Sequence, residues 1–357
     1  MHKRKQPGLR VLLYVGRFRP KSKHDFGEDL VRRISRGRHS IAGLILSKGD
    51  PLTIRMRNSG IPVFNLLPIL DQPLSEIKAS LRDRKCKENL SAWLGKLSAL
   101  NPDIGVVFYG GWLPPELFRL PVRGFVNYHP APLPDLRGVE PDTFAVLEGR
   151  KTMWGTVHKV SSSYDEGSII GRTTQMKVAR YMTPVVVWHT LTEYGINAVL
   201  RALDRIYNGG VIFEKQAKGS AGLAATRKRA RFESVIKWNS DTPDMIHRRL
   251  LAFCGQDISI RLKADVGGKR YCVRDLEIHR GRFPGRPGDI IGWYGGRGKY
   301  LKQPVVCAKG GVVVLELGRL IRLGAESSEE PLFNIIPSCR RRQITDVRTI
   351  RRSIFLE

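Results

Sequence analysis

The sequence predicts an α/β chain: a Rossmann-like, mostly parallel sheet with helices on both faces, followed by a small OB-like β-barrel domain. Two observations support this prediction. In the first 208 residues, short apolar runs typical of buried strands alternate with longer segments of helical periodicity, an order that favours right-handed crossovers and a parallel sheet. After residue 230, short strand-like runs follow one another with glycine-rich turns, as in small open barrels.

The predicted N-terminal domain covers residues 1–208. Its strands are short apolar runs, and its helices carry apolar residues three or four positions apart, as Phe26, Leu30 and Ile34 do. The last helix, 183–208, is expected to close the domain. Strands are expected at 10–16, 39–47, 61–66, 103–109, 123–129, 152–160 and 167–178, and the other helices at 25–35 and 88–100.

Residues 209–230 have the glycine-rich, basic composition of a linker. The OB-like domain is predicted at 231–325, with one helix at 242–253. Residues 326–357 form a basic tail to which no fold is assigned. Strands of this domain are expected at 234–238, 258–266, 269–277, 287–293 and 305–317.

Length and composition narrow the class of protein. The chain has 357 residues, enough for two domains, and 41% of them are hydrophobic. There is no apolar stretch of about 18 residues and no apolar segment of a secretory signal near the start, so we expect a cytoplasmic protein without membrane association. Five scattered cysteines, none in Cys-x-x-Cys spacing, argue against a disulfide framework and against a zinc site. We expect no metal. The oligomeric state cannot be read from the sequence.

The net charge of +28 suggests a polyanionic partner. Two local clusters stand out, and both are candidates for contact with a nucleic acid. Alternatively, the charge is a solvated surface typical of an arginine-rich proteome, since basic residues are spread over both halves of the chain. The clusters consist of Arg227, Lys228, Arg229 and Arg231, and of Arg340, Arg341 and Arg342.

Three polar residues at strand ends are the candidate catalytic group. Asn127 and His129 lie two positions apart near the end of an apolar run, so their side chains leave the same face of the strand. A proline-rich turn then stops the strand. Asp165 lies in a later Ser/Gly-rich turn, from which a carboxylate can fold back to orient the imidazole, as a third group does in other acid–base sites. The alternative is a buried histidine that is only structurally satisfied.

Around these residues the chain resembles the folate-dependent formyltransferase family. The family pattern is Asn-x-His-Pro-x-x-Leu-Pro-x-x-Arg-Gly, then a Thr-Gly-x-Thr-x-His-like strand, then Asp-x-Gly-x-Ile-Ile. The matching blocks are Asn127–Gly138, Thr152–His158 and Asp165–Ile170. The resemblance implies transfer of a formyl group from the co-substrate 10-formyltetrahydrofolate to a primary amine. Asn127 would stabilise the oxyanion, His129 would stabilise it or protonate the leaving folate nitrogen, and Asp165 would orient His129 or help a water molecule remove the amine proton.

The resemblance also implies a folate pocket. The segment from Tyr109 to Leu117 is similar to the family's Tyr-Gly-x-x-Leu-Pro loop, which lines the pterin site. A loop of this composition is also compatible with ordinary core, and the arginine of the Arg-Gly pair with a structural brace. The turn after the first strand lacks the Gly-x-Gly-x-x-Gly pattern, so a dinucleotide cofactor has no support. The folate-binding candidates are Tyr109, Gly110, Trp112, Leu113, Pro134, Arg137 and Gly138.

The acceptor stays open. The C-terminal part resembles the domain that follows the catalytic domain in the tRNA-specific and amino-arabinose members of the family, and the basic clusters favour a tRNA acceptor, methionyl-tRNA. Two departures stand against it and leave open a small amine, such as an amino sugar or a biosynthetic intermediate. The tRNA enzymes carry a long basic insertion where this chain has only 47–51, and Ser-Leu-Leu-Pro where it reads Pro-Ala-Pro-Leu-Pro at 130–134. A third alternative is a silent homologue that binds RNA or folate without transfer.

Overall fold

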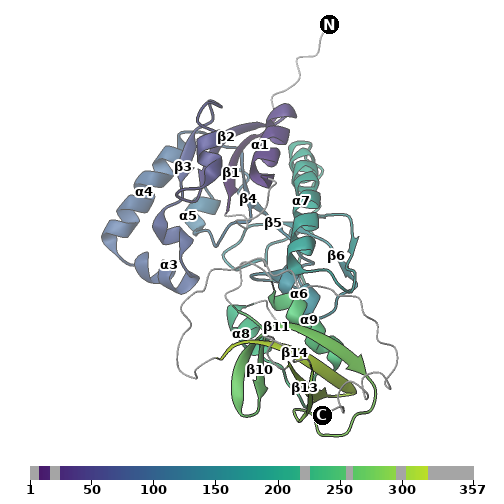
Figure 1. Cartoon of the computed structure of the whole chain (residues 1–357). Helices are drawn as coiled ribbons and strands as arrows, with labels where there is room; N and C mark the ends of the chain where they lie inside the picture. The colour runs from purple at the N-terminus through teal and green to yellow at the C-terminus, as the bar shows by residue number, and fades with distance from the viewer. Residues whose placement is uncertain (1–7, 17–24, 218–225, 255–259, 295–302, 321–357) are drawn as a thin grey trace. The chain divides into compact units, whose positions relative to one another are not determined.

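The computed structural model describes residues 8–16, 25–217, 226–254, 260–294 and 303–320 (Figure 1). The chain forms two compact units, each discussed by itself. The first unit spans Met1–Gly138, Thr152–Met176 and Trp188–Ala224. The second spans Val139–Lys151, Lys177–Val187 and Ala225–Glu357. The units therefore interleave along the sequence, whereas we expected one linker at 209–230 between them.

The first unit is built on a seven-stranded sheet with the order β3-β2-β1-β4-β5-β7-β8. The first five of these strands are parallel, and β7 and β8 continue the sheet in antiparallel pairing. The prediction of a mostly parallel sheet is confirmed. The strands are β1 (Arg10–Val15), β2 (Ser40–Leu46), β3 (Val63–Asn65), β4 (Ile104–Phe108), β5 (Phe125–His129), β7 (Thr156–Lys159) and β8 (Ile169–Arg172).

Helices cover both faces of this sheet. Side chains that alternate along β1 show this, because they pack into two different clusters. Val11, Leu13 and Val15 join a buried cluster with apolar residues of α1 and α7, whereas Leu12 and Tyr14 join a second cluster with those of α3, α4 and α5. Two hydrophobic cores thus hold the strands in place. The helices are α1 (Phe26–Arg36), α2 (Pro51–Arg55), η1 (Pro68–Asp71), α3 (Leu74–Ser80), α4 (Arg84–Ser98), α5 (Pro115–Phe118) and α7 (Pro184–Tyr207).

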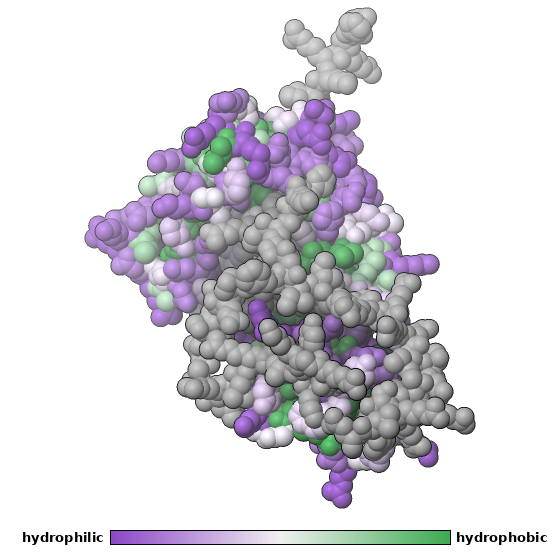
Figure 2. All heavy atoms as spheres, in the orientation of Figure 1, coloured by the Kyte–Doolittle hydropathy of each residue, from purple (hydrophilic) through white to green (hydrophobic). Residues whose placement is uncertain are grey.

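The surface view agrees with this arrangement. Hydrophilic residues predominate over α3 and α4 on the face that Figure 2 shows. In α4, Leu90, Trp93 and Leu97 are buried at three- and four-residue spacing, so the opposite side of the helix carries its polar residues.

The expected strands 152–160 and 167–178 are each interrupted. The first consists of β6 (Thr152–Met153) and β7, and the second of β8 and β9 (Met176–Lys177); β6 and β9 form a separate two-stranded sheet. Gly155 lies in the first break, where a Cβ atom would come within 2.2 Å of the Tyr128 hydroxyl. The Tyr128 side chain lies so close to this position that only glycine fits at the break between β6 and β7.

The second unit combines an antiparallel sheet with helices α6 (Pro141–Leu147), α8 (Arg227–Glu233) and α9 (Pro243–Phe253). The sheet order is β10-β11-β14-β13-β12, with β10 and β12 at the edges of the part that the structure describes. Antiparallel strands were expected here; closure into an OB-like barrel stays a prediction. The strands are β10 (Lys263–Val266), β11 (Lys269–Arg280), β12 (Ile290–Tyr294), β13 (Gln303–Ala308) and β14 (Gly311–Leu320).

The expected strand 305–317 is in fact a hairpin. Ala308 pairs with Gly311, which leaves Lys309 and Gly310 as a two-residue turn between β13 and β14. Gly310 has φ +80°, a left-handed conformation that glycine adopts without steric cost. The Lys-Gly pair was the signal for this turn, and the continuous apolar character of both flanks masked it.

Among the residues that the structure describes, no helix combines the length and the apolarity needed to cross a bilayer. No cluster of three or more His, Cys, Asp and Glu side chains in this part of the chain is arranged to hold a metal ion.

Candidate functional site

The candidate site begins at the carboxyl end of β5, where Asn127 and His129 leave the sheet on one face. On one side β5 pairs in parallel with β4, and on the other it pairs antiparallel with β7, where Asn127 lies opposite His158. Ligands of open α/β sheets bind beyond the carboxyl ends of the parallel strands. The predicted catalytic residues therefore lie at the edge of the sheet where such a site is expected.

His129 is held at both ring nitrogens. Its side chain is buried, with Nδ1 3.6 Å from Oδ2 of Asp165 and Nε2 2.7 Å from the carbonyl oxygen of Leu136. A carbonyl only accepts hydrogen bonds, so Nε2 donates to Leu136. Both ring nitrogens thus face oxygen atoms.

Asp165 is the centre of the group. Its backbone has φ +52°, a left-handed conformation that aspartate tolerates better than most residues, and the carboxylate points into the site. Oδ2 accepts a hydrogen bond of 2.9 Å from the backbone N–H of Gly138. Burial raises the pKa of Asp165, but the neighbouring imidazoles of His129 and His158 and the backbone N–H of Gly138 outweigh burial and hold the pKa well below its usual range. Asp165 is thus an anion with an imidazole nitrogen near each of its carboxylate oxygens.

A second histidine, His158, completes the group. Its Nε2 lies 3.5 Å from Oδ1 of Asp165 and 3.1 Å from Nδ2 of Asn127, and its Nδ1 lies 2.9 Å from the Lys159 carbonyl oxygen. Since Nδ1 must donate to that carbonyl, a neutral His158 ring accepts at Nε2 from the Asn127 amide. His158 was not among the predicted site residues. The available signal was its place at the end of the Thr152–His158 block, but only the β5–β7 pairing brings it to Asn127.

Asn127 keeps hydrogen-bonding capacity for a ligand. Its Nδ2 carries two hydrogens, of which His158 takes one, and its Oδ1 is buried without a hydrogen-bond partner among the described residues. Buried polar atoms are normally paired. An amide with a free hydrogen and an unpaired oxygen fits contact with both a donor and an acceptor of a substrate.

The loop that follows β4 is fixed to the Asp165 turn. Trp112 donates from Nε1 to the Ser162 carbonyl at 3.0 Å and from its backbone N–H to the Tyr164 hydroxyl at 3.2 Å. Tyr109 has φ +64° and bonds through its hydroxyl to Thr192 at 2.5 Å. The side chains of Trp112 and Leu113 are buried in the second core cluster, so the loop brings the expected folate-binding segment beside the Asp165 turn and uses these two side chains for packing.

Arg137 is a brace in this structure. Its guanidinium donates to Oε1 of Gln216 at 2.8 and 3.2 Å and lies 3.3 Å from Glu166. Gln216 in turn donates to the carbonyls of Asp165 and Gly167 at 2.7 and 2.8 Å. Gln216 lies in the expected linker, yet it helps to fix the left-handed turn of Asp165. Two further folate-binding candidates, Pro134, which follows a cis peptide bond, and Gly138, lie on either side of Arg137 in the same loop.

The first basic cluster lies on α8. Lys228 and Arg231 are exposed, whereas Arg229 forms an ion pair with Glu148 at 2.7 Å and lies over the ring of Phe144 at 4.4 Å. Arg229 thus holds α8 to α6 within the second unit. The side chain of Arg227 and the second cluster, Arg340, Arg341 and Arg342, lie outside the described residues.

Known proteins resemble this chain in sequence and in fold. The formyl transferase family matches residues 24–203. A methionyl-tRNA formyltransferase of Buchnera aphidicola subsp. Acyrthosiphon pisum is 28% identical over 207 residues, which cover 57% of this chain and 58% of that relative. The chain thus spans little more than half the length of the curated relative that it matches.

Two solved structures share the fold. HypX from Aquifex aeolicus, in complex with tetrahydrofolic acid, has a TM-score of 0.52 and 15% identity over 86% of this chain and 43% of that one. The N-formyltransferase from Helicobacter canadensis, in complex with folinic acid and dTDP-3-aminofucose, has a TM-score of 0.54 and 14% identity over 87% of this chain and 100% of that one. The family profile covers half of the sequence, including Asn127, His129, His158 and Asp165. The chain belongs to the formyl transferase family.

Proposed function

We propose that this protein transfers a formyl group from 10-formyltetrahydrofolate to a primary amine, with the amino group of methionyl-tRNA as the first candidate acceptor. One observation carries the proposal. In a chain of this family, Asn127 contacts His158, and both His158 and His129 contact the same buried carboxylate, that of Asp165. Such a set of an amide, two imidazoles and a carboxylate serves acyl transfer through a tetrahedral intermediate.

Each residue has a distinct role in this proposal. Asn127 donates its remaining amide hydrogen to the oxyanion that forms when the amine attacks the formyl carbon. His129 places positive charge beside that oxyanion, and it can protonate the leaving folate nitrogen once Nε2 leaves the Leu136 carbonyl. The proton that the attacking amine loses as the amide forms then restores the charged ring. Asp165 orients His129 and balances its charge.

The co-substrate site is assigned to the two loops beside Asn127. The unpaired Oδ1 of Asn127 is a buried acceptor that fits an N–H group, either of the attacking amine or of the folate. The 109–113 loop offers backbone groups from Tyr109 and Gly110. Pro134 and Gly138 belong to the loop that follows β5, in which Arg137 serves as the brace.

Opposing observations bear on the acceptor. Lys228 and Arg231 are exposed on α8, and the sequence relative from Buchnera is named for methionyl-tRNA, which supports tRNA. The second candidate is a small amine such as an amino sugar. After β2 the chain reaches α2 at Pro51 without a long basic insertion, and the Helicobacter canadensis fold relative, solved with an amino-sugar nucleotide, aligns over its full length.

The reaction itself is tested by tracing the formyl group. Formyl-labelled 10-formyltetrahydrofolate is incubated with the protein and with separate pools of charged tRNA and small amines, and the labelled product identifies the acceptor. Asn127→Ala should lower turnover about 10²–10³-fold, as loss of an oxyanion donor does elsewhere. Asn197→Ala, an exposed asparagine on α7, should transfer at the wild-type rate. Folate binding without transfer to any pool would instead indicate a silent homologue.

A salt titration separates the two acceptors. If tRNA is the acceptor, its affinity should fall steeply with salt, and Lys228→Gln with Arg231→Gln should weaken binding and flatten that dependence. Arg229 is left unchanged because it pairs with Glu148. Rapid turnover of a small amine by a protein that does not bind tRNA would reverse the ranking.

A further inference from the structure

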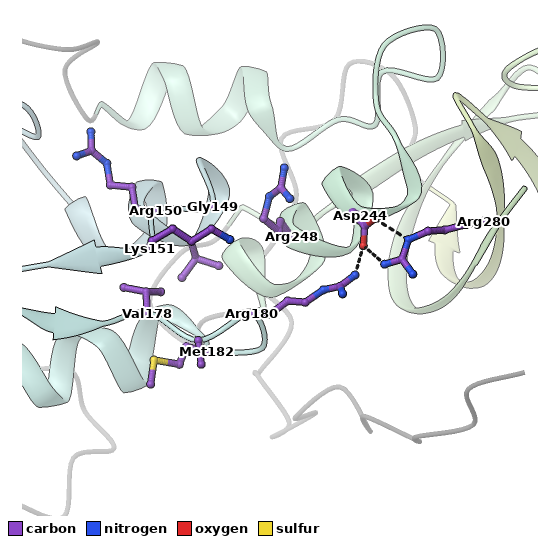
Figure 3. A pocket seen from close by; sticks show the side chains of 11 residues that line it. Gly149, Arg150, Lys151, Val178, Arg180, Met182, Asp244, Arg248 and Arg280 are labelled. Carbon is purple, nitrogen blue, oxygen red and sulfur yellow. Dashed lines mark hydrogen bonds and ion pairs between the residues drawn. The ribbon is translucent and has the colours of Figure 1, made fainter. Parts of the chain in front are cut away.

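A cavity of about 290 Å³ in the second unit has five basic side chains in its lining (Figure 3). It lies between α6, the segment that precedes α7, and α9, and all of its lining residues belong to that unit. Its apolar wall comes from Val146, Val178, Ala179 and Met182. Its charged residues are Arg150, Lys151, Arg180, Arg248 and Arg280, with Asp244 as the one acidic lining residue among those that the structure describes.

Three of these five cations already reach carboxylates. Arg180 and Arg280 meet on Asp244, the latter with hydrogen bonds of 2.6 and 2.9 Å, and Arg150 lies 3.0 Å from Glu148. Hydrogen bonds from Arg280 lower the pKa of Asp244 despite its partial burial, so this carboxylate is an anion shared by two arginines. The pairing leaves an excess of positive charge in the cavity.

Lys151 and Arg248 account for the remaining charge. Neither has an ion pair with a carboxylate of the described residues, and no interaction line reaches either one in Figure 3. The Nε of Arg248 is buried and has no hydrogen-bond partner there. A buried N–H without an acceptor is unfavourable, and a guanidinium stays charged at all ordinary pH values, so this nitrogen fits an anionic acceptor.

The local backbone is shaped around Arg248. Gly149 has φ +66°, and a Cβ atom at this position would come within 3.1 Å of Nε and 3.2 Å of Cδ of Arg248. Glycine therefore permits both the left-handed turn and the close packing of the arginine side chain. The Arg248 side chain therefore packs against the Gly149 backbone at the cavity wall.

We infer that this cavity is a binding site for a phosphate group, with Arg248 and Lys151 as its main ligands. A planar guanidinium matches two phosphate oxygens, and an ammonium adds a compact charge. The apolar wall leaves room for an uncharged part of the ligand beside the phosphate. The phosphate comes either from a small phosphorylated molecule or from a nucleic-acid backbone. The inference is independent of the proposed formyl transfer.

The test is calorimetric titration of the full-length protein with inorganic pyrophosphate at low ionic strength, without folate. We expect saturable binding that weakens as salt is raised. Arg248→Gln and Lys151→Gln should each weaken it about tenfold, as loss of a charge-assisted hydrogen bond does. Arg274→Gln and Lys309→Gln, exposed residues of the same unit that do not line the cavity, are the matched controls.

The outcomes are distinct. Absence of pyrophosphate binding by the wild-type protein, or equal loss in the cavity variants and the controls, would overturn the site. Lys151 is exposed, so its variant keeps the test valid if the Arg248 variant does not fold. A competition arm identifies the source of the phosphate. Displacement of pyrophosphate by a short RNA supports a nucleic-acid backbone, and displacement by a nucleoside diphosphate but not by the RNA supports a small ligand.

Discussion

Asn127 and His158 lie directly opposite each other in the β5–β7 pair, and their side chains are 3.1 Å apart. At this pair the strand pairing of the sheet changes from parallel to antiparallel. His158 also contacts Asp165, so one residue connects the amide of the site with its carboxylate.

We predict that His158→Ala lowers kcat about tenfold or more. This reduction should be smaller than the reduction in kcat that follows loss of a direct oxyanion donor. Without the ring, Asn127 loses the acceptor that fixes its amide. His158→Gln retains an acceptor and should recover part of the rate. Steady-state kinetics of both variants provide the measurement. His247→Ala, which changes a histidine of the second unit, is the control. An unchanged kcat in His158→Ala would show that Asn127 is held by other contacts.

Asp165→Asn should remove most activity and also change how stability depends on pH. The folded pKa of Asp165 lies below its ordinary value. Its charge therefore stabilises the fold above the unfolded pKa of about 3.9, and this contribution declines as the pH falls below that value. Unfolding midpoints in urea from pH 6 to pH 3 should fall more steeply for the wild-type protein than for Asp165→Asn. Glu193→Gln, an exposed change on α7, should keep the wild-type slope.

Variants of Arg137 and Gln216 test whether Arg137 supports the Asp165 turn or binds the folate directly. As a brace, Arg137 acts through Gln216, so Arg137→Ala and Gln216→Ala should lower kcat by similar factors, and the double variant should lose little more than either single one. As a direct folate ligand, Arg137→Ala would raise the KM for folate while Gln216→Ala left it unchanged. The structure leads us to expect the first pattern.

Arg249 of α9 should be critical for stability. It is buried and donates to Asp241 at 2.8 and 3.1 Å and to the Glu233 carboxylate at 2.7 Å. Arg249→Met leaves the fully buried Asp241 without its cation, and loss of one partner of a buried pair costs about 3–5 kcal/mol. Urea unfolding of this variant and of Arg274→Met, an exposed site on β11, measures the difference. Equal free energies of unfolding would mean that Asp241 finds other partners.

Local patterns predicted much of the first unit. The buried strands β1, β2, β4 and β5 and the helices α1, α4 and α7 follow the expected order because apolar periodicity is strong there. Asp25 caps α1 by accepting from Glu28 at 2.9 Å, a signal that lies within four residues. The family prediction is confirmed, and the Asp165–His129 contact follows from its motifs.

Features that depend on tertiary pairing were not predicted. His158 and Gln216 join the site through contacts with residues 31 and 51 positions away, which no local pattern encodes. Short helices such as α2 and α5 have too few residues for periodicity to reveal. Arg229 appeared as a free basic residue because its partner Glu148 lies 81 positions away.

Each of the two units consists of several separate segments of the chain, which limits where the protein can be cut into parts. In α6, Phe144, Ala145 and Val146 are buried, and this helix packs against α9. Expression of a catalytic half that stops at residue 208 would retain α6 and discard α9, which leaves that apolar surface exposed to water and prone to aggregation. Any truncated version for screening, or any chimera that swaps the C-terminal part, must therefore carry a replacement for 139–151 as well.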